Sequence, residues 1–330
     1  MTPIVHAAID GLRAALESLE WPERFERIAK ARKVAADDET RDAILALRGE
    51  LAGRALVELG PGWGTRPFKD AILELPKRMR GPLSRAAKDL RDRRIAAVMA
   101  MGGLPLHGSA ERGPFAVGLD ERAVEMPLAL ASARLDQPGE VLDAGSALNL
   151  PLVRAICAHP RARLTHFTLP GSEEPVIPSE DDRFVYAFGD LRAMPFPDGA
   201  FARAVCVSTL EHVAMDATRF GAAPTTAAGG ADAAVAEIIR VLEPKGTLLA
   251  TVPYGRAAEH GWFRVLDRDG LRQLFEPAAA HELTARFFYY DGGWAEGTDT
   301  PPASVVASPY CDDVITGVAI VHVIKRRGGA

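Results

Sequence analysis

The chain has 330 residues and a formal net charge of −5 at pH 7, with 48% hydrophobic and 25% charged residues. This balance is typical of a globular protein with a substantial core, and the acidic net charge argues against a dedicated nucleic-acid binder. The three cysteines are far apart and give no disulfide framework. No apolar run is long enough to cross a bilayer, and the N-terminus carries charges where a signal peptide needs an apolar stretch. We therefore expect a cytoplasmic protein without membrane association.

The first third of the chain is predicted to be helical. Apolar residues recur there at helical spacing, and Pro22 and Asp37–Asp38 are suitable helix starts. The predicted helices are 6–19, 21–34, 37–51, 76–94 and 121–135. The basic stretch 77–94 is expected to be a solvated helix face, and contact with an anionic acceptor is the alternative.

From residue 140 the pattern changes. Short apolar runs alternate with helical segments, which is typical of a parallel sheet with helices on both faces. Two strand-like runs near the end, 286–294 and 315–326, have no helix between them. We therefore expect the last strand to run antiparallel to its neighbours.

Two stretches resemble a cofactor-binding loop: LVELGPGWGT at 56–65 and VLDAGSALNL at 141–150. Such a loop needs a helix directly after it and a second strand about 20 residues further on. The first stretch is followed by basic helical sequence and is predicted to be a strand end with tight turns. The second is followed by a helical segment and the strand-like run 163–169. We therefore place the cofactor loop at 141–150.

The segment 140–254 resembles the class I S-adenosylmethionine-dependent methyltransferases. Within that class it is most similar to the methyltransferases of type 11. The resemblance is carried by GDLRAMPFPDGAFARAVCVSTLEHV at 189–213 and by EIIRVLEPKGTLLATVP at 237–253. The run 251–275 is similar to a bacterial subgroup associated with surface glycans and secondary metabolites. The resemblance implies an α/β, Rossmann-like, seven-stranded and mostly parallel sheet with an antiparallel last strand.

The chain is accordingly divided into two parts. Residues 1–115 are expected to form a mainly helical cap, which serves for oligomerisation as a homodimer or for substrate binding. Residues 116–330 are expected to form the methyltransferase domain.

The resemblance also implies S-adenosylmethionine as the cofactor and a set of residues that contact it. Gly145 admits the carboxypropyl arm, Asp143 orients the loop or accepts from the amino group, and Asp190 accepts from the adenine amino group. The full predicted set is Asp143, Gly145, Ser146, Thr168, Leu169, Gly189, Asp190, Leu191, Ser208 and Thr209.

Two features depart from the family's pattern. Only the first glycine of the loop is retained, because Ser146, Ala147, Leu148 and Asn149 follow Gly145. Thr168 stands where an acidic residue usually holds the ribose, and Glu173 or Glu174 is a candidate substitute. These departures motivate the alternative of a non-catalytic partner subunit with the same fold.

Two histidines are candidates for the general base. His212 follows the predicted fourth strand and His260 follows the fifth, so adjacent strands would bring both to one rim. Glu211, His212 and His260 also form an alternative divalent-metal set, although no metal is expected.

We predict an enzyme that transfers a methyl group from S-adenosylmethionine to a small-molecule or glycan acceptor, chiefly by O-methylation. N-methylation of a small metabolite is the alternative reaction. A nicotinamide-dependent oxidoreductase is disfavoured, because 143–150 lacks G-x-G-x-x-G.

Overall fold

The structure is a computed structural model, and its described residues are 2–59, 72, 75–100, 115–157, 160–171, 182–216, 218, 221, 228–303, 305 and 315–327. Residues 60–65 of the first glycine-rich stretch, and the candidate ribose contacts Glu173 and Glu174, lie outside the described residues.

The N-terminal part is helical, as predicted. Its helices are α1 (Pro3–Leu16), α2 (Trp21–Val34), α3 (Asp38–Leu59) and α5 (Lys77–Ala100). The side chain at the predicted start of α3 caps that helix, since Asp37 Oδ1 accepts from Thr40 N at 2.7 Å. Apolar residues of all four helices form one cluster, in which Phe25, Ile28, Leu47 and Leu83 are almost fully buried.

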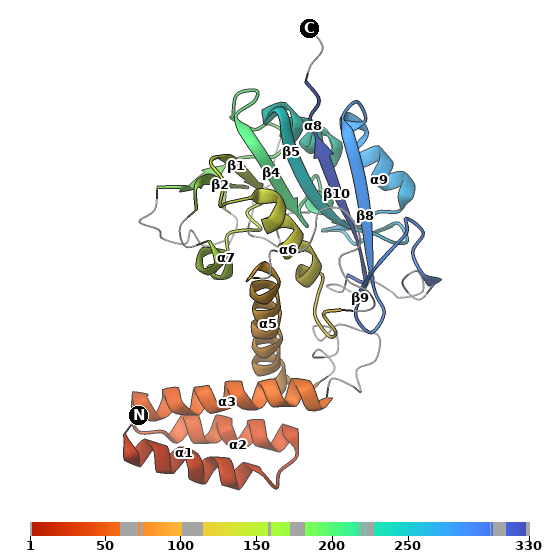
Figure 1. The fold of residues 1–330 in the computed structure, drawn as a ribbon. Coiled ribbons are helices and arrows are strands. Elements are labelled where there is room, and N and C mark those ends of the chain that lie inside the picture. The colour runs from red at the N-terminus through yellow and green to blue at the C-terminus, as the bar shows by residue number, and fades with distance from the viewer. Residues whose placement is uncertain are drawn as a thin grey trace.

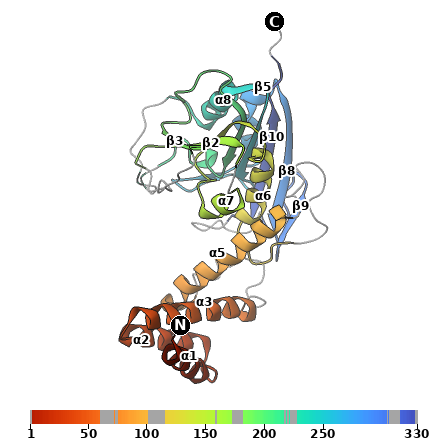
Figure 2. The same ribbon diagram turned by 60° about the vertical axis from the view of Figure 1, so that its left-hand side comes forward.

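Figure 1 shows α1, α2 and α3 as a layer of helices beside the α/β part, with α5 running from this layer towards the sheet. Figure 2 shows the same arrangement from another side. The apolar residues Ile95 and Val98 at the end of α5 belong to the cluster that covers one face of the sheet. Helix α5 is therefore the packing link between the two regions, while the division at 115/116 stays a prediction.

The prediction of a strand end at 56–59 was wrong. These residues form the last turn of the 22-residue helix α3. The physical reason is twofold: Ala, Leu and Glu favour a helix, and a strand here would have no neighbouring strand with which to pair.

The α/β part is built on one large sheet. Its strand order is β3-β2-β1-β4-β5-β10-β8-β9, and β6 and β7 form a separate two-stranded sheet. The strands are β1 (Gly139–Ala144), β2 (Ala162–Thr168), β3 (Phe184–Phe188), β4 (Phe201–Val207), β5 (Leu242–Pro253), β6 (Ala258–Glu259), β7 (Arg264–Val265), β8 (Glu282–Tyr290), β9 (Trp294–Gly297) and β10 (Gly317–Ile324).

The strand directions confirm the predicted Rossmann-like α/β fold. Strands β1 to β5 are mutually parallel, and β10 lies antiparallel between β5 and β8. The sheet has eight strands instead of the expected seven. The additional strand is the short edge strand β9, which pairs antiparallel with β8.

Helices cover both faces of the sheet. Alternate residues of the central strands enter opposite cores: Val205 packs with α6 (Arg122–Ala133) and α7 (Pro151–Ile156), whereas Cys206 packs with α8 (Ala231–Val241) and α9 (Arg268–Leu274). The short turns η2 (Leu210–His212) and η4 (Glu276–Ala278) follow β4 and α9. Both faces of the central strands are therefore buried, which explains why these strands appear in the sequence as continuous apolar runs.

The segment before α6 is joined to the far edge of the sheet. The Phe115 and Trp294 backbones exchange hydrogen bonds of 2.8 and 2.7 Å, and the buried Trp294 indole donates to the Leu119 carbonyl at 2.9 Å. These contacts fix the start of α6 against β9. Of the helices that the structure describes, none combines the length and apolar composition needed to cross a bilayer.

Candidate functional site

The strand order places a topological switch point between β1 and β4. After β1 the chain proceeds to β2 and β3 on one side, and it then returns to β4 and β5 on the other side. Ligands of open parallel sheets bind outside the carboxyl ends of the strands at such a reversal. The loop at 145–150 follows β1 there, and Ser208 and Thr209 follow β4. The predicted loop therefore lies at the switch point.

Gly145 and Thr209 are closely packed against each other at this point. Gly145 has φ +98°, and a Cβ built on it would lie 2.1 Å from Thr209 Oγ1 and 2.4 Å from Thr209 Cγ2. Both the left-handed conformation and the close approach exclude a side chain. The position requires glycine, independently of any ligand.

The rest of the loop is held by side chains. The buried carboxylate of Asp143 accepts from Leu148 N at 2.9 Å and from His166 Nδ1 at 2.7 Å, both through Oδ2. Tyr186 donates from its hydroxyl to Asn149 Oδ1 at 2.8 Å. Asp143, His166 and Tyr186 form one row across β1, β2 and β3. This row holds the second half of the loop at Leu148 and Asn149, which supports a turn that has a single glycine.

Asp143 Oδ1 is buried and has no hydrogen-bond partner among the described residues. Ser146, next to Gly145, adopts φ +59° and is 4% exposed. A buried carboxylate oxygen without a partner among the described residues fits a ligand that brings its own donor.

The ends of β2 and β3 carry the second part of the predicted set. Gly189 N donates to the Thr168 carbonyl at 2.9 Å, which brings residues 168–169 beside 189–191. The Asp190 carboxylate accepts from Arg192 Nε at 3.0 Å and from Arg192 Nη2 at 2.9 Å. Leu191 is buried in the core. Asp190 is thus oriented by an arginine that the sequence analysis did not single out.

Ser208 faces helix α6. Its hydroxyl donates to Glu125 Oε1 at 2.7 Å, and the Thr251 hydroxyl donates to the same oxygen at 2.6 Å. Glu125 is fully buried, and its other oxygen lies 3.3 Å from Arg122 Nη1. The ends of β4 and β5 are therefore tied to the first turn of α6 through one carboxylate.

Glu211 belongs to the same polar region. It is 2% exposed, and its Oε2 has no hydrogen-bond partner among the described residues. Burial raises the pKa of the Glu211 carboxyl to about 8, and the neighbouring Glu125 carboxylate adds to the shift. Glu211 is accordingly a neutral acid near pH 7.

The structure brings the two candidate histidines into one aromatic cluster. The His212 ring stacks on Trp262 with centroids 5.1 Å apart, and the His260 ring stacks on Phe263 at 4.6 Å. Trp262 and Phe263 are themselves in contact at 4.6 Å. The loop between β6 and β7 thus brings His260 to the same aromatic pair that His212 of η2 contacts, while the catalytic roles of the two histidines stay predictions.

One hydrogen bond fixes the tautomer of His212. Its Nδ1 lies 2.8 Å from the Trp262 carbonyl, which can only accept, so Nδ1 carries the proton. In the neutral ring Nε2 is then the basic nitrogen. It lies 3.9 Å from Glu211 Oε1.

The alternative metal set is not assembled. Among the residues that the structure describes, no group of three or more His, Cys, Asp and Glu side chains is placed to hold a metal ion. Glu211 is buried against α6, while the imidazoles stack on the aromatic rings. Glu211, His212 and His260 therefore form no joint ligand set.

The sequence analysis missed Glu125, His166 and Arg192. Glu125 lies within an apolar helical run and is 83 residues from Ser208, so no local pattern marks it. His166 could have been found, because a polar residue inside an otherwise apolar strand needs a buried partner. Arg192 is two residues from Asp190, so an ion pair between these two side chains could have been predicted from the sequence.

Comparisons with known proteins concern the fold. No family profile matches the chain, and no curated protein matches it. The [4+2]-cyclase SpnF is 20% identical over 73% of this chain and 94% of its own, with a TM-score of 0.42. A methyltransferase in complex with the Haloferax volcanii Trm112 activator is 16% identical over 79% and 99%, with a TM-score of 0.40.

A third similar structure is the Burkholderia thailandensis 1,6-didemethyltoxoflavin-N1-methyltransferase, which holds 1,6-didemethyltoxoflavin and S-adenosylhomocysteine. It is 17% identical over 63% of this chain and 80% of its own, with a TM-score of 0.39. These values assign no reaction to the chain, so its function has to be argued from the site.

Gly145→Ala should lower the free energy of unfolding by more than about 2 kcal/mol, because the new Cβ clashes with Thr209 and φ becomes strained. Gly261→Ala is the matched control, since Gly261 has φ +79° and open space around it. The control should cost about 1 kcal/mol. Adding Thr209→Gly should recover part of the first loss. Equal losses in urea titrations of the two single variants would contradict the close approach.

Stability should fall with rising pH because of Glu211. Its carboxyl titrates near 4.5 in the unfolded chain and near 8 when folded, so between these values only the folded state holds the proton. The free energy of unfolding then decreases by up to about 1.4 kcal/mol per pH unit across that window. Glu211→Gln should flatten this slope and exceed the wild type in stability above about pH 8. If urea titrations gave the wild type and Glu211→Gln the same dependence of unfolding free energy on pH, the raised pKa of Glu211 would be contradicted.

Proposed function

We propose that the chain is an S-adenosylmethionine-dependent methyltransferase that acts on a small-molecule or glycan acceptor, chiefly on a hydroxyl. The observation that carries the proposal is the meeting of Gly145 and Thr209 at the β1/β4 switch point, with both candidate histidines beyond the adjoining strand ends. This is the position and the backbone geometry that a nucleotide-type cofactor uses in such sheets.

The residues of the site fit this cofactor. Gly145 offers backbone without a side chain, and Asp143 Oδ1 offers a buried acceptor. Asp190, oriented by Arg192, would accept from the adenine amino group. Thr168 would lie beside the ribose. S-adenosylmethionine supplies a methyl group already activated on a sulfonium, so the protein's main contribution is alignment.

His212 is the preferred general base. Its Nδ1–H is held by the Trp262 carbonyl, and stacking on Trp262 fixes the plane of the ring. Nε2 therefore has a set orientation from which it can take the acceptor's proton. His260 is the alternative base, on the same aromatic cluster.

Calorimetric titration with S-adenosylmethionine tests the proposal, with NAD as the competing cofactor. We expect binding of the former only. Asp190→Ala should weaken it by roughly 1–3 kcal/mol, or about 5- to 150-fold in Kd, because the adenine acceptor is lost. Asp198→Ala is the control, since Asp198 is exposed and pairs with Arg240. No heat with millimolar S-adenosylmethionine would refute the proposal. Binding without turnover over a broad acceptor panel would favour the non-catalytic alternative.

The role of His212 is tested with asparagine, which can still donate to the Trp262 carbonyl but has no basic nitrogen. His212→Asn should lower kcat by roughly 10²- to 10⁴-fold with an unchanged cofactor Kd, and it should remove the acidic limb of the pH–rate profile. His260→Asn is the matched variant and should change kcat by only a few-fold. The reverse result would assign the base to His260.

A further inference from the structure

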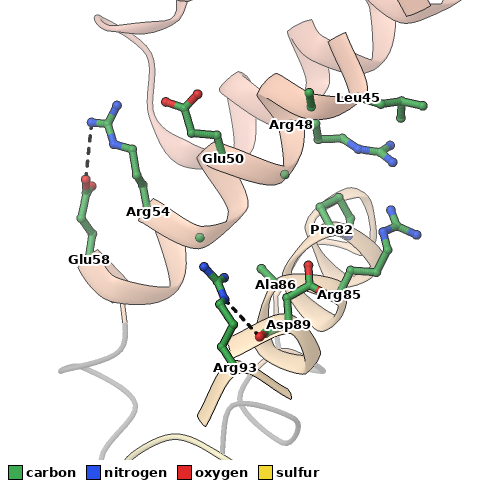
Figure 3. Close-up of a pocket in the computed structure, with 13 residues that line it drawn as sticks. Leu45, Arg48, Glu50, Arg54, Glu58, Pro82, Arg85, Ala86, Asp89 and Arg93 are labelled. Carbon is green, nitrogen blue, oxygen red and sulfur yellow. Dashed lines mark hydrogen bonds and ion pairs between the residues drawn. The ribbon is translucent and has the colours of Figure 1, made fainter. Parts of the chain in front are cut away.

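A groove in the helical region lies outside the site described above. It has a volume of about 920 Å³ and runs between α3 and α5. Its charged lining residues are Arg48, Glu50, Arg54, Glu58, Arg85, Asp89 and Arg93. Figure 3 shows these side chains projecting from the two helices around the groove.

The charges are paired at one end of this groove. Arg54 lies 3.7 Å from Glu58, and Glu50 accepts from Arg13 at 2.5 and 2.9 Å. In Figure 3 the Arg54, Glu50 and Glu58 side chains lie together, away from Arg48 and Arg85. This end carries carboxylates that are already neutralised by the chain's own arginines.

The opposite end carries two arginines that have no carboxylate partner among the described residues. Arg48 from α3 and Arg85 from α5 point to the same side of the groove in Figure 3. Neither makes a hydrogen bond or ion pair with any residue that the structure describes, and Asp89, one turn beyond Arg85, forms no ion pair with it there. Burial lowers the pKa of the half-buried Arg48, and the nearby Arg85 and Arg32 guanidinium groups lower it further.

The like charges of Arg48 and the exposed Arg85 repel each other, and an anion bound between them would relieve this repulsion. A guanidinium group does not lose its proton in proteins, so the mutual repulsion of the cations persists. Two planar guanidinium groups on the same side of the groove offer donors for the oxygens of a phosphate group, which each can bind through two parallel hydrogen bonds. The volume of the groove is within the range that small-molecule ligands occupy.

We propose that the Arg48–Arg85 end of this groove binds the phosphate group of a phosphorylated small molecule, whose uncharged body extends towards Glu50 and Glu58. The paired end has no excess positive charge to hold a continuous polyanion such as RNA, while its carboxylates can still accept hydrogen bonds from hydroxyl or amino groups. Arg32 adds long-range attraction from α2. The proposal does not depend on the methyl-transfer reaction.

Calorimetric titrations of the full-length protein with glucose 6-phosphate and with inorganic pyrophosphate test this inference. Glucose serves as the neutral control and sulfate at matched ionic strength as the control for general anion screening. We expect both phosphates to bind, and Arg48→Gln and Arg85→Gln each to weaken binding about tenfold or more. Arg54→Gln, in the same groove but from the paired end, should keep the wild-type Kd.

A second measurement separates a binding role from a structural one. Without ligand, Arg48→Gln should have a Tm equal to or above that of the wild type, because a repulsive contact is removed. Four outcomes would overturn the inference: no phosphate binding at millimolar concentration, equal binding of sulfate, equal loss in Arg54→Gln, or a clearly lowered Tm in Arg48→Gln. Tighter binding of a single-stranded RNA oligonucleotide through the same arginines would replace the small ligand with a nucleic acid.

Discussion

The close approach of Gly145 to Thr209 is the constraint on which the site depends. It joins the ends of β1 and β4, the two neighbouring strands between which the chain reverses its direction of winding. Any side chain at 145 would force these strand ends apart, so the approach of the two strand ends depends on glycine at this position.

The loop after β1 shows that glycines are not the only way to build such a turn. Here Asp143 holds the backbone of Leu148, and Tyr186 holds the side chain of Asn149. The first of these bonds is buried and the second is partly buried, and removing one partner of a buried hydrogen bond leaves the other unsatisfied. The loop therefore depends on β2 and β3 more than a glycine-rich loop would.

The sequence predicted the order and type of most elements, because apolar spacing differs clearly between the helices and the central strands. It also placed Gly145, Asp190 and His212 at strand ends, since strand ends are local features. It misjudged 56–59, where a short apolar run is compatible with either a strand or a helix. Glu125 and the Arg48–Arg85 end escaped it, because both arise from residues far apart in the chain that only packing brings together.

The pairing of Phe115 with Trp294 has a consequence for biosynthesis. The indole of Trp294 reaches a carbonyl 175 residues earlier, and β10 fills the gap between β5 and β8. The sheet therefore stays open until nearly all of the polypeptide has left the ribosome. The N-terminal helices, whose apolar cluster uses residues 5–123, can pack long before that. Folding of this chain should accordingly proceed in two stages, with a fast helical part and a late-closing sheet.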